Sequence, residues 1–378
     1  MTSPAFATGA HGRNFGLDLL RAVAILLVLV GHSLAHQAPP EWARWFFGGQ
    51  GMLGVELFFV LSGFLIGGII IRLARSGRLH TPGDVWQFWA RRWARTLPAY
   101  FLFLLVYARV DYLGPANPQT DWPFMIFMQN FAWPQLPFFQ HSWSLAIEEW
   151  FYFLFPLVFL VFAAGSERSY RWPMLLTCVG FIVVPMYLRW QISAGVKGFD
   201  DFNFLIRMVV VCRLDSIFFG VLLALVRAQY PGAYSTLGKL WWVSVPAFAA
   251  MMVYIAKSMP GLVDSRVAMT VFFPVLSLVC ASLIPAAERL RTLGVGAADR
   301  FVTHTSLISY SLYLGHICML QLVNAVLGIA GVQVVGTLSS IAVYGAYFVA
   351  YYALATLTYN FVEKPYLELR DMRAVKAA

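Results

Sequence analysis

The feature that most constrains this chain is a series of about ten apolar stretches, each roughly 20 residues long. A helix of that length crosses the ~30 Å hydrocarbon core of a bilayer. The pattern predicts an all-α polytopic membrane protein. The expected spans lie near residues 15–36, 51–73, 97–113, 145–164, 173–192, 205–226, 240–257, 267–287, 305–329 and 334–361.

Composition agrees with this class, because 60% of the 378 residues are hydrophobic and only 12% are charged. The net charge of +9 would suit a nucleic-acid-binding protein. The arginines, however, cluster in alternate connections between the apolar stretches, which is typical of the cytoplasmic side of a membrane. We therefore expect both termini to be cytoplasmic and no nucleic-acid partner. We expect one domain over residues 1–378, with a core at 15–365 and a cytoplasmic tail at 366–378.

Several familiar motifs fail their structural tests. The string Gly49–Gly54 matches GxGxxG, but no strand precedes it and no βαβ unit surrounds it. His80 and Asp84 match the HxxxD of some soluble acyltransferases, yet they lie in a short arginine-rich connection, which favours chance. The four cysteines lie in apolar stretches without a CxxC pair, which indicates small core residues and neither a disulfide framework nor a zinc site.

Two ionisable residues in the first span carry the strongest functional signal. Arg21 and His32 are 11 positions apart, so on a helix they point the same way with about 16.5 Å of rise between them. Ionisable side chains inside a span usually line a bundle interior or a cavity. The alternative is a snorkelling arginine and a histidine that is hydrogen-bonded to a neighbouring helix.

Other polar residues lie at the edges of later spans. Arg92 and Arg95 share one helical face and could form a fork for phosphate oxygens, or could only set topology. Ser62-Gly63 would allow a close helix contact, and Glu56 could sit near the outer interface. At least one of Glu148 and Glu149 needs a cationic or hydrogen-bonding partner. Arg213 and Asp215 are most simply an ion pair.

Seven such motifs occur in order along nearly the whole chain, and with them the chain resembles the integral-membrane acyltransferase 3 family. The motifs are Arg21 with His32, Gly54–Ile66, Arg92 with Arg95, the S-L-x-x-E-x-x-F-Y run from Ser144 to Tyr152, Arg213 with Asp215, the S-Y-x-x-Y-L-x-H run from Ser309 to His316, and Glu363–Pro365. Glu56 stands where Asp is frequent. Gly315 replaces a bulky residue, which could alter the shape of the pocket. The chain lacks the esterase-like domain of some members and looks like a stand-alone enzyme.

The resemblance implies transfer of an acyl group, commonly acetyl, from acyl-CoA to a hydroxyl of a surface glycan or a small molecule. Together with the chemistry of imidazole, it makes His32 the expected general base, with Glu148 to orient it or stabilise its charged form. Arg92 and Arg95, with help from Arg91 and Arg21, are expected to hold the phosphates of acetyl-CoA arriving from the cytoplasm. Substrate-binding roles are expected for Ser144, Tyr310 and His316, and no metal site is expected.

The acceptor is expected to arrive from the periplasmic side of a bacterial inner membrane, under a structured cap formed by residues 111–142. The sequence leaves the acceptor open between a glycan and a macrolide-like small molecule, and leaves open direct transfer or an acyl-histidine intermediate. A proton-coupled transporter and a scaffold remain competing classes. A transporter would often show inverted repeats, and none is evident.

Overall fold

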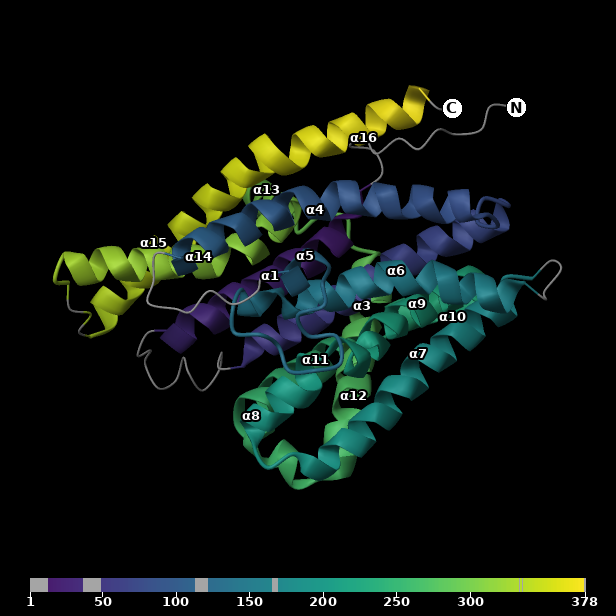
Figure 1. Ribbon diagram of the computed structural model, residues 1–378, viewed down its shortest axis with the longest axis horizontal. Coiled ribbons are helices and arrows are strands. Elements are labelled where there is room, and N and C mark those ends of the chain that lie inside the picture. Colours follow the sequence, from purple (N-terminus) through teal and green to yellow (C-terminus); the bar gives the residue numbers. More distant parts are fainter. Residues whose placement is uncertain are drawn as a thin grey trace.

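The computed structural model describes residues 13–36, 49–112, 122–164, 169–332, 334 and 336–376. These residues form helices and turns with no strand among them (Figure 1). The longer helices are α1 (Phe15–His36), α3 (Gln50–Arg75), α4 (Pro82–Tyr112), α6 (Trp143–Ala163), α7 (Arg171–Ile192), α9 (Leu214–Gln229), α10 (Pro231–Lys239), α11 (Trp241–Ser258), α12 (Arg266–Ala287), α13 (Gly296–Leu307), α14 (Ser309–Ile329), α15 (Thr337–Thr358) and α16 (Lys364–Lys376).

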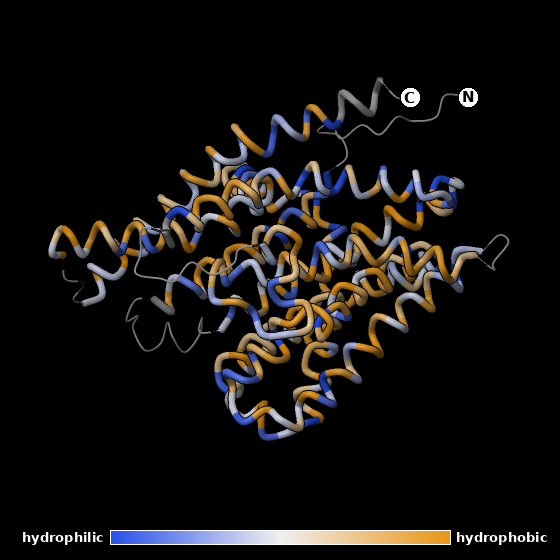
Figure 2. Tube along the Cα trace, viewed as in Figure 1, coloured by the Kyte–Doolittle hydropathy of each residue, from blue (hydrophilic) through white to orange (hydrophobic). Residues whose placement is uncertain are grey.

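Seven segments in the described part of the chain are long and apolar enough to cross a membrane. They coincide with seven of the ten predicted spans and are Phe15–Leu34, Gln50–Arg75, Gln140–Ala163, Arg171–Gly195, Arg266–Ala287, Ser309–Ile329 and Thr337–Arg370. Figure 2 shows apolar residues along these helices and polar ones mainly at their ends and connections. The described residues thus confirm an all-helical protein with several membrane-spanning helices, and the cytoplasmic placement of the termini stays a prediction.

The three remaining predicted spans are interrupted or carry polar residues. The 97–113 stretch is the second half of α4, a helix of 31 residues whose first half bears three arginines. The 205–226 stretch begins in the π-helical turn Phe202–Arg207 and the 3₁₀ turn Val210–Cys212, and α9 then bends by 117° into α10. The 240–257 stretch is α11, which starts with two tryptophans and ends near Lys257. The apolar content of the sequence does not reveal the turns in the 205–226 stretch.

Helices α1, α3 and α9 pack closely because glycines face the neighbouring backbone. A Cβ on Gly63 would lie 1.8 Å from the Ile217 carbonyl oxygen, and a Cβ on Gly220 would lie 2.0 Å from that of Val60. The expected close contact at Ser62-Gly63 is therefore confirmed. Around this centre, α16 lies beside α4, and α7, α11 and α12 lie on the opposite side (Figure 1).

Two rejected motifs have structural explanations. Gly49 has a φ of 78° at the start of α3, and a Cβ on Gly54 would lie 2.4 Å from the Ala24 carbonyl oxygen, so these GxGxxG glycines serve a helix start and a helix contact. Thr81 and Asp84 form a capping box at the start of α4. Asp84 accepts the backbone N–H groups of His80 and Thr81, at 3.0 and 2.9 Å, and the Thr81 hydroxyl. These bonds, outside the predicted spans, hold the pKa of the Asp84 carboxyl below its usual range.

Four fully buried charges form two ion pairs among α3, α7, α9 and α12. The Arg213 guanidinium contacts the Glu56 carboxylate at 2.5 Å, and Arg189 contacts Asp215 at 2.6 Å. Ser277 donates a second hydrogen bond to Glu56. The predicted pairing of Arg213 with Asp215 is therefore wrong, since each binds a partner on another helix. Glu56 is 1% exposed, so its carboxylate lies inside the bundle.

The described parts of the predicted cap and of the predicted tail are ordered, which agrees with the expectation of a structured cap and adds a helix in the tail. Residues 113–121 lie outside the described part of the chain, but the rest of the 111–142 segment packs onto the bundle. It contains the short helix α5 (Trp122–Met125) and the 3₁₀ turn η1 (Gln140–Ser142). Tyr100 donates to the Phe124 carbonyl at 2.8 Å, and Trp150 donates to that of Phe127 at 2.9 Å. In the tail, residues through 376 continue as α16, and 377–378 fall outside the described residues.

The cysteines and Gly315 are explained by packing. Cys178, Cys212 and Cys280 are buried, Cys318 is partly buried, and all four are free thiols, which confirms the prediction of core residues. Beside Gly315, a Cβ would lie 2.8 Å from the Leu354 side chain and 3.0 Å from that of Phe103. These two side chains occupy the space that a larger residue would need.

Candidate active site

Five helices enclose a polar cavity of about 140 Å³, which we call the central pocket. Helices α1, α3, α4, α6 and α14 each contribute polar side chains to it. Those side chains are Arg21, Ser62, Arg92, Arg95, Thr96, Ser144, Glu148, Tyr152, Ser309, Tyr310 and Tyr313. The pocket thus gathers residues from motifs that lie almost 300 positions apart in the sequence.

The three arginines of the central pocket differ in their partners. Arg21 contacts the Asp18 carboxylate at 3.0 Å, and Arg13 contacts the same group at 2.9 Å. Arg92 and Arg95 form no ion pair with any carboxylate in the described ranges. Arg92 is partly buried, and it lies near the like charge of Arg95 and near the Glu148 carboxylate, with which it forms no ion pair. Such an arrangement provides binding energy for an anion that enters the pocket.

Glu148 is held by hydroxyl groups within the central pocket. Ser62 donates to its Oε1 atom at 2.5 Å, and the Tyr152 hydroxyl donates to the same oxygen. This confirms that one of the paired carboxylates has hydrogen-bonding partners. His316 contacts the His32 ring, and Glu148 accepts its hydrogen bonds from Ser62 and Tyr152, so the geometry gives no support to an orienting role for Glu148. Glu149 faces a different cavity.

Three histidines gather behind one wall of the pocket. The ring centroids of His32 and His316 are 4.9 Å apart, and those of His141 and His316 are 5.4 Å apart. We call His32, His141 and His316 the histidine cluster. In each ring, one nitrogen also forms a hydrogen bond with a backbone carbonyl oxygen. His32 Nδ1 lies 2.9 Å from Val28 O, His316 Nδ1 2.7 Å from Tyr313 O, and His141 Nε2 3.2 Å from Leu314 O.

Tyr313 separates the histidine cluster from the central pocket. Its hydroxyl contacts the Ser144 hydroxyl at 2.5 Å and donates to the His141 carbonyl at 2.9 Å. Its ring centroid lies 5.8 Å from that of His316. Tyr310, one turn earlier on α14, donates to the Thr96 carbonyl at 2.9 Å. Tyr313 and Ser144 therefore form the side of the pocket that faces the histidines.

Comparison with known proteins places the chain in a family. The model of the family described as "Acyltransferase domain", Acyl_transf_3, matches residues 14–360. The chain belongs to the acyltransferase 3 family. The match covers every residue of the central pocket and the histidine cluster, so both lie within the family's own domain.

The similar proteins include "O-acetyltransferase OatA" of Staphylococcus aureus (strain NCTC 8325 / PS 47), 29% identical over 234 residues. That alignment covers 56% of this chain and 34% of the relative. "Putative O-acetyltransferase SACOL0978" of Staphylococcus aureus (strain COL) is 26% identical over 233 residues, 55% of this chain and 34% of the relative. The alignments span about a third of the length of these relatives. No solved structure matches the chain.

In this acyltransferase 3 chain, the sequence-predicted residues divide into three groups. Six of them line the central pocket: Arg21, Arg92, Arg95, Ser144, Glu148 and Tyr310. His32 and His316 lie together in the histidine cluster, outside the lining of the pocket. Arg91 is in neither place, because it is one residue, or about 100° of helix, from Arg92.

Sequence reasoning assigned no catalytic or binding role to Tyr313, His141, Ser62 or Tyr152. All four stand inside motifs that were recognised, and Tyr313 and His141 lie three residues before His316 and Ser144. On a helix a spacing of three places two side chains on one face, which was the available signal. Among the described residues, no group of three or more His, Cys, Asp or Glu side chains could hold a metal ion.

Proposed function

We propose that this chain is a membrane O-acyltransferase that moves an acetyl group from acetyl-CoA to a hydroxyl of a surface or exported glycan, with His32 as general base. The observation that carries the proposal is the central pocket, with two unpaired arginines, beside a cluster of histidines, in a chain of the acyltransferase 3 family. The acetyl group and the oxygen acceptor follow the names of the relatives, which are called O-acetyltransferases.

The donor would be held at the arginine end of the pocket. Coenzyme A carries several phosphate groups, and guanidinium forks bind phosphate oxygens through paired hydrogen bonds. Arg92 and Arg95 have no carboxylate partner among the described residues and so can bind phosphates without breaking an ion pair. Arg21 and His32 are ~16.5 Å apart along the axis of α1. The long pantetheine arm would span this distance from the arginines to the histidine.

The hydrogen bonds of the cluster assign the base nitrogen. A carbonyl oxygen can only accept, so His32 Nδ1 carries the proton that Val28 O accepts. In the neutral ring, His32 Nε2 then carries the lone pair. By the same reasoning His316 Nδ1 donates to Tyr313 O, which leaves His316 Nε2 as an acceptor 3.3 Å from His32 Nδ1. His316 is therefore proposed as a positioning residue, in place of the expected Glu148. These tautomers are assigned from partners.

In the proposed reaction, His32 Nε2 takes the proton of the acceptor hydroxyl as its oxygen attacks the thioester carbonyl carbon. The new C–O bond forms the ester, the C–S bond breaks, and the thiolate of coenzyme A leaves. The imidazolium returns its proton to that sulfur, so the free thiol and the neutral base are regenerated. The His316 ring, and the Val28 carbonyl that His32 contacts, keep the imidazole in one orientation through both proton transfers.

The test compares ester-linked acetyl groups on the surface glycans of cells that express the wild type, His32→Ala, His304→Ala or no protein. His304 lies on α13 with an exposed side chain and serves as the matched histidine control. The masses of the glycans are measured by mass spectrometry before and after treatment with mild alkali. Each protein must be present in the membrane at the same level. Alkali-labile acetyl groups are expected with the wild type and His304→Ala only.

Two outcomes would contradict the proposal in different ways. If His32→Ala acetylates as well as the wild type, the base is assigned to the wrong residue. If no cell gains acetyl esters, the glycan acceptor is wrong. Transfer by the purified protein to small-molecule alcohols would then identify the other acceptor class, and solute uptake without transfer would indicate transport.

A further inference from the structure

A second cavity opens on the other side of α6 from the central pocket, and we call it the lateral pocket. It has a volume of about 300 Å³ and is lined by α4, α6 and the α5 segment of the cap. Three residues at its rim, Phe101, Met125 and Ile126, are 41%, 57% and 55% exposed. These apolar side chains open the pocket to the outside of the bundle, where lipid chains can contact them, and the pocket shares no lining residue with the central pocket.

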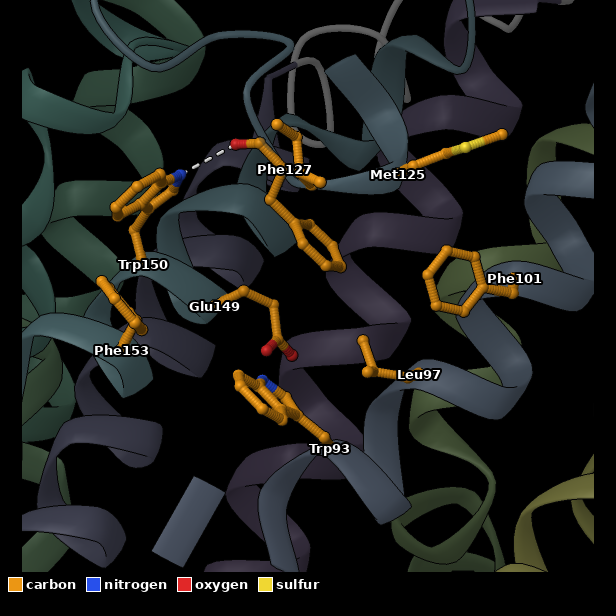
Figure 3. A pocket seen from close by; sticks show the side chains of 9 residues that line it. Trp93, Leu97, Phe101, Met125, Phe127, Glu149, Trp150 and Phe153 are labelled. Atoms are coloured by element: carbon orange, nitrogen blue, oxygen red, sulfur yellow. Dashed lines mark hydrogen bonds between the residues drawn. The ribbon is translucent and has the colours of Figure 1, made fainter. Parts of the chain in front are cut away.

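One carboxylate lies at the bottom of this apolar cavity. Glu149 is 7% exposed, and its Oε2 atom has no hydrogen-bond partner. Figure 3 shows its carboxyl group directed toward Trp93, beneath the Phe127 ring. Glu149 follows Glu148 by about 100° of helix rotation, which turns it away from the hydroxyl groups that hold Glu148. A buried polar atom without a partner is costly, and it marks a place where a ligand can supply the missing bond.

Aromatic rings surround this carboxylate. Trp93, Phe127, Trp150 and Phe153 line the lateral pocket beside it, and Phe101 lies at the rim (Figure 3). The backbone of Phe127 has a φ of 58°, which is uncommon for a residue other than glycine. The Trp150 indole N–H donates to the Phe127 backbone carbonyl at 2.9 Å and so ties the Trp150 ring to the Phe127 backbone. The faces of these rings carry negative electrostatic potential, which attracts cations.

The charge of the lateral pocket and the small number of polar groups in its lining indicate which class of ligand it can bind. No basic side chain lines the lateral pocket, and Glu149 is its one charged residue. A sugar would bring several hydroxyl groups, most of which would find only ring faces. An organic ammonium group needs one carboxylate and a few aromatic faces, which is the chemistry that the pocket offers.

We propose that the lateral pocket binds an organic ammonium group, with the Glu149 carboxylate as its counter-ion and the surrounding aromatic rings as its cage. The ammonium donates a hydrogen bond to the unpartnered Oε2 atom, and the attached carbon chain extends past the apolar rim. The group can come from the headgroup of an aminolipid or from a free alkylamine. This site is separate from the acyl-transfer chemistry and does not depend on it.

The experiment uses two probes of equal length that differ in charge. Binding of n-butylammonium and of 1-butanol to the purified full chain in detergent is measured by saturation-transfer NMR for the wild type, Glu149→Gln and Glu368→Gln. Glu368 is an exposed carboxylate on α16 and serves as the control. We expect n-butylammonium to bind at least tenfold more tightly than 1-butanol to the wild type and Glu368→Gln, and to lose that advantage in Glu149→Gln.

The lipid source is tested by native mass spectrometry of protein released from nanodiscs of equal phosphatidylethanolamine and phosphatidylglycerol. Selective retention of phosphatidylethanolamine by the wild type, lost in Glu149→Gln, identifies an aminolipid. Binding of n-butylammonium without that retention identifies a free amine. Equal binding of both butyl probes to the wild type overturns the proposal even if Glu149→Gln does not fold, and so does unchanged n-butylammonium affinity in a folded Glu149→Gln.

Discussion

Two regions of this membrane bundle each contain a pair of arginines. The arginines of one region form ion pairs with carboxylates, and those of the other region form none in the described residues. Among α3, α7, α9 and α12, Arg189 and Arg213 are fully buried, and each contacts a carboxylate on another helix. In the central pocket, Arg92 and Arg95 face a cavity and have no carboxylate partner in the described residues. The first pair holds helices together, and the second is available to a ligand.

The difference shows why charge inside an apolar sequence does not by itself identify a site. A buried ion pair has no net charge and encloses no open volume, so it offers a charged substrate little. Further hydrogen bonds complete the first region, since Arg189 also donates to the carbonyls of Cys212 and Thr270. In the second region the guanidinium groups lie beside hydroxyls and Glu148, around an open volume. Unpaired charge next to a cavity is the better indicator of function.

The largest expected effect comes from breaking a buried pair. Arg213→Met leaves the Glu56 carboxylate without its cation inside the bundle, which should cost ~3–5 kcal/mol of stability. We expect a much lower unfolding temperature in detergent and a lower yield in the membrane, both measured against the wild type.

A second substitution separates the loss of a charge from the loss of the arginine side chain. Glu56→Leu added to Arg213→Met removes the uncompensated carboxylate, and it should restore most of the unfolding temperature. If Arg213→Met alone is as stable as the wild type, the pair does not hold the helices as described.

A smaller effect is expected at the start of α4, the helix that carries Arg92 and Arg95. The pKa of Asp84 is lowered by the backbone N–H groups of His80 and Thr81, so its carboxylate form stabilises the folded state. That contribution is present at neutral pH and is lost as the pH falls through the lowered pKa. Asp84→Asn should lower the unfolding temperature by no more than ~2 °C at pH 7.

The control for the capping box is the pH dependence itself. The difference between Asp84→Asn and the wild type should shrink when unfolding is measured at progressively lower pH, below the usual range of a carboxyl group. A difference that is constant with pH would show that the carboxylate charge has no part in the cap.

The smallest effect on stability is expected in the central pocket. Arg92→Gln combined with Arg95→Gln removes two like charges that form no ion pair with a carboxylate in the described residues, so folding should not suffer. We expect a change within about 0.5 kcal/mol, measured as unfolding temperature without ligand. A loss comparable to that of Arg213→Met would mean that these arginines are structural, and the contrast between the two regions would disappear.

The sequence predicted those elements whose signal is local. The seven long apolar spans, the close contact at Ser62-Gly63 and the shared helical face that brings Arg92 and Arg95 to one pocket all follow from spacing along one helix. The pairing of Arg213 with Glu56 could not be predicted in this way, because it joins residues 157 positions apart, and neighbours in the sequence were a misleading guide.

The site shows the same limit. The motifs named Arg21, His32, Ser144, Glu148 and Tyr310, but only the packing of five helices shows which of them share a cavity. His32 contacts His316, 284 residues away on α14, a partner that the sequence did not indicate. The break in the 205–226 segment was also hidden, since apolar content does not report π-helical and 3₁₀ turns.

The most direct test of the account is a comparison of two donors on two proteins. Acetyl-CoA carries phosphates, and S-acetyl-pantetheine has the same thioester without them. Their affinities are measured calorimetrically for the wild type, for Arg92→Gln with Arg95→Gln, and for Arg91→Gln, which changes a neighbouring arginine outside the pocket lining. The account predicts that the double variant loses at least ~100-fold in affinity for acetyl-CoA and almost nothing for S-acetyl-pantetheine, while Arg91→Gln matches the wild type. Equal losses for both donors, or none for acetyl-CoA, would contradict the claim that these unpaired arginines hold the phosphates of the acyl donor.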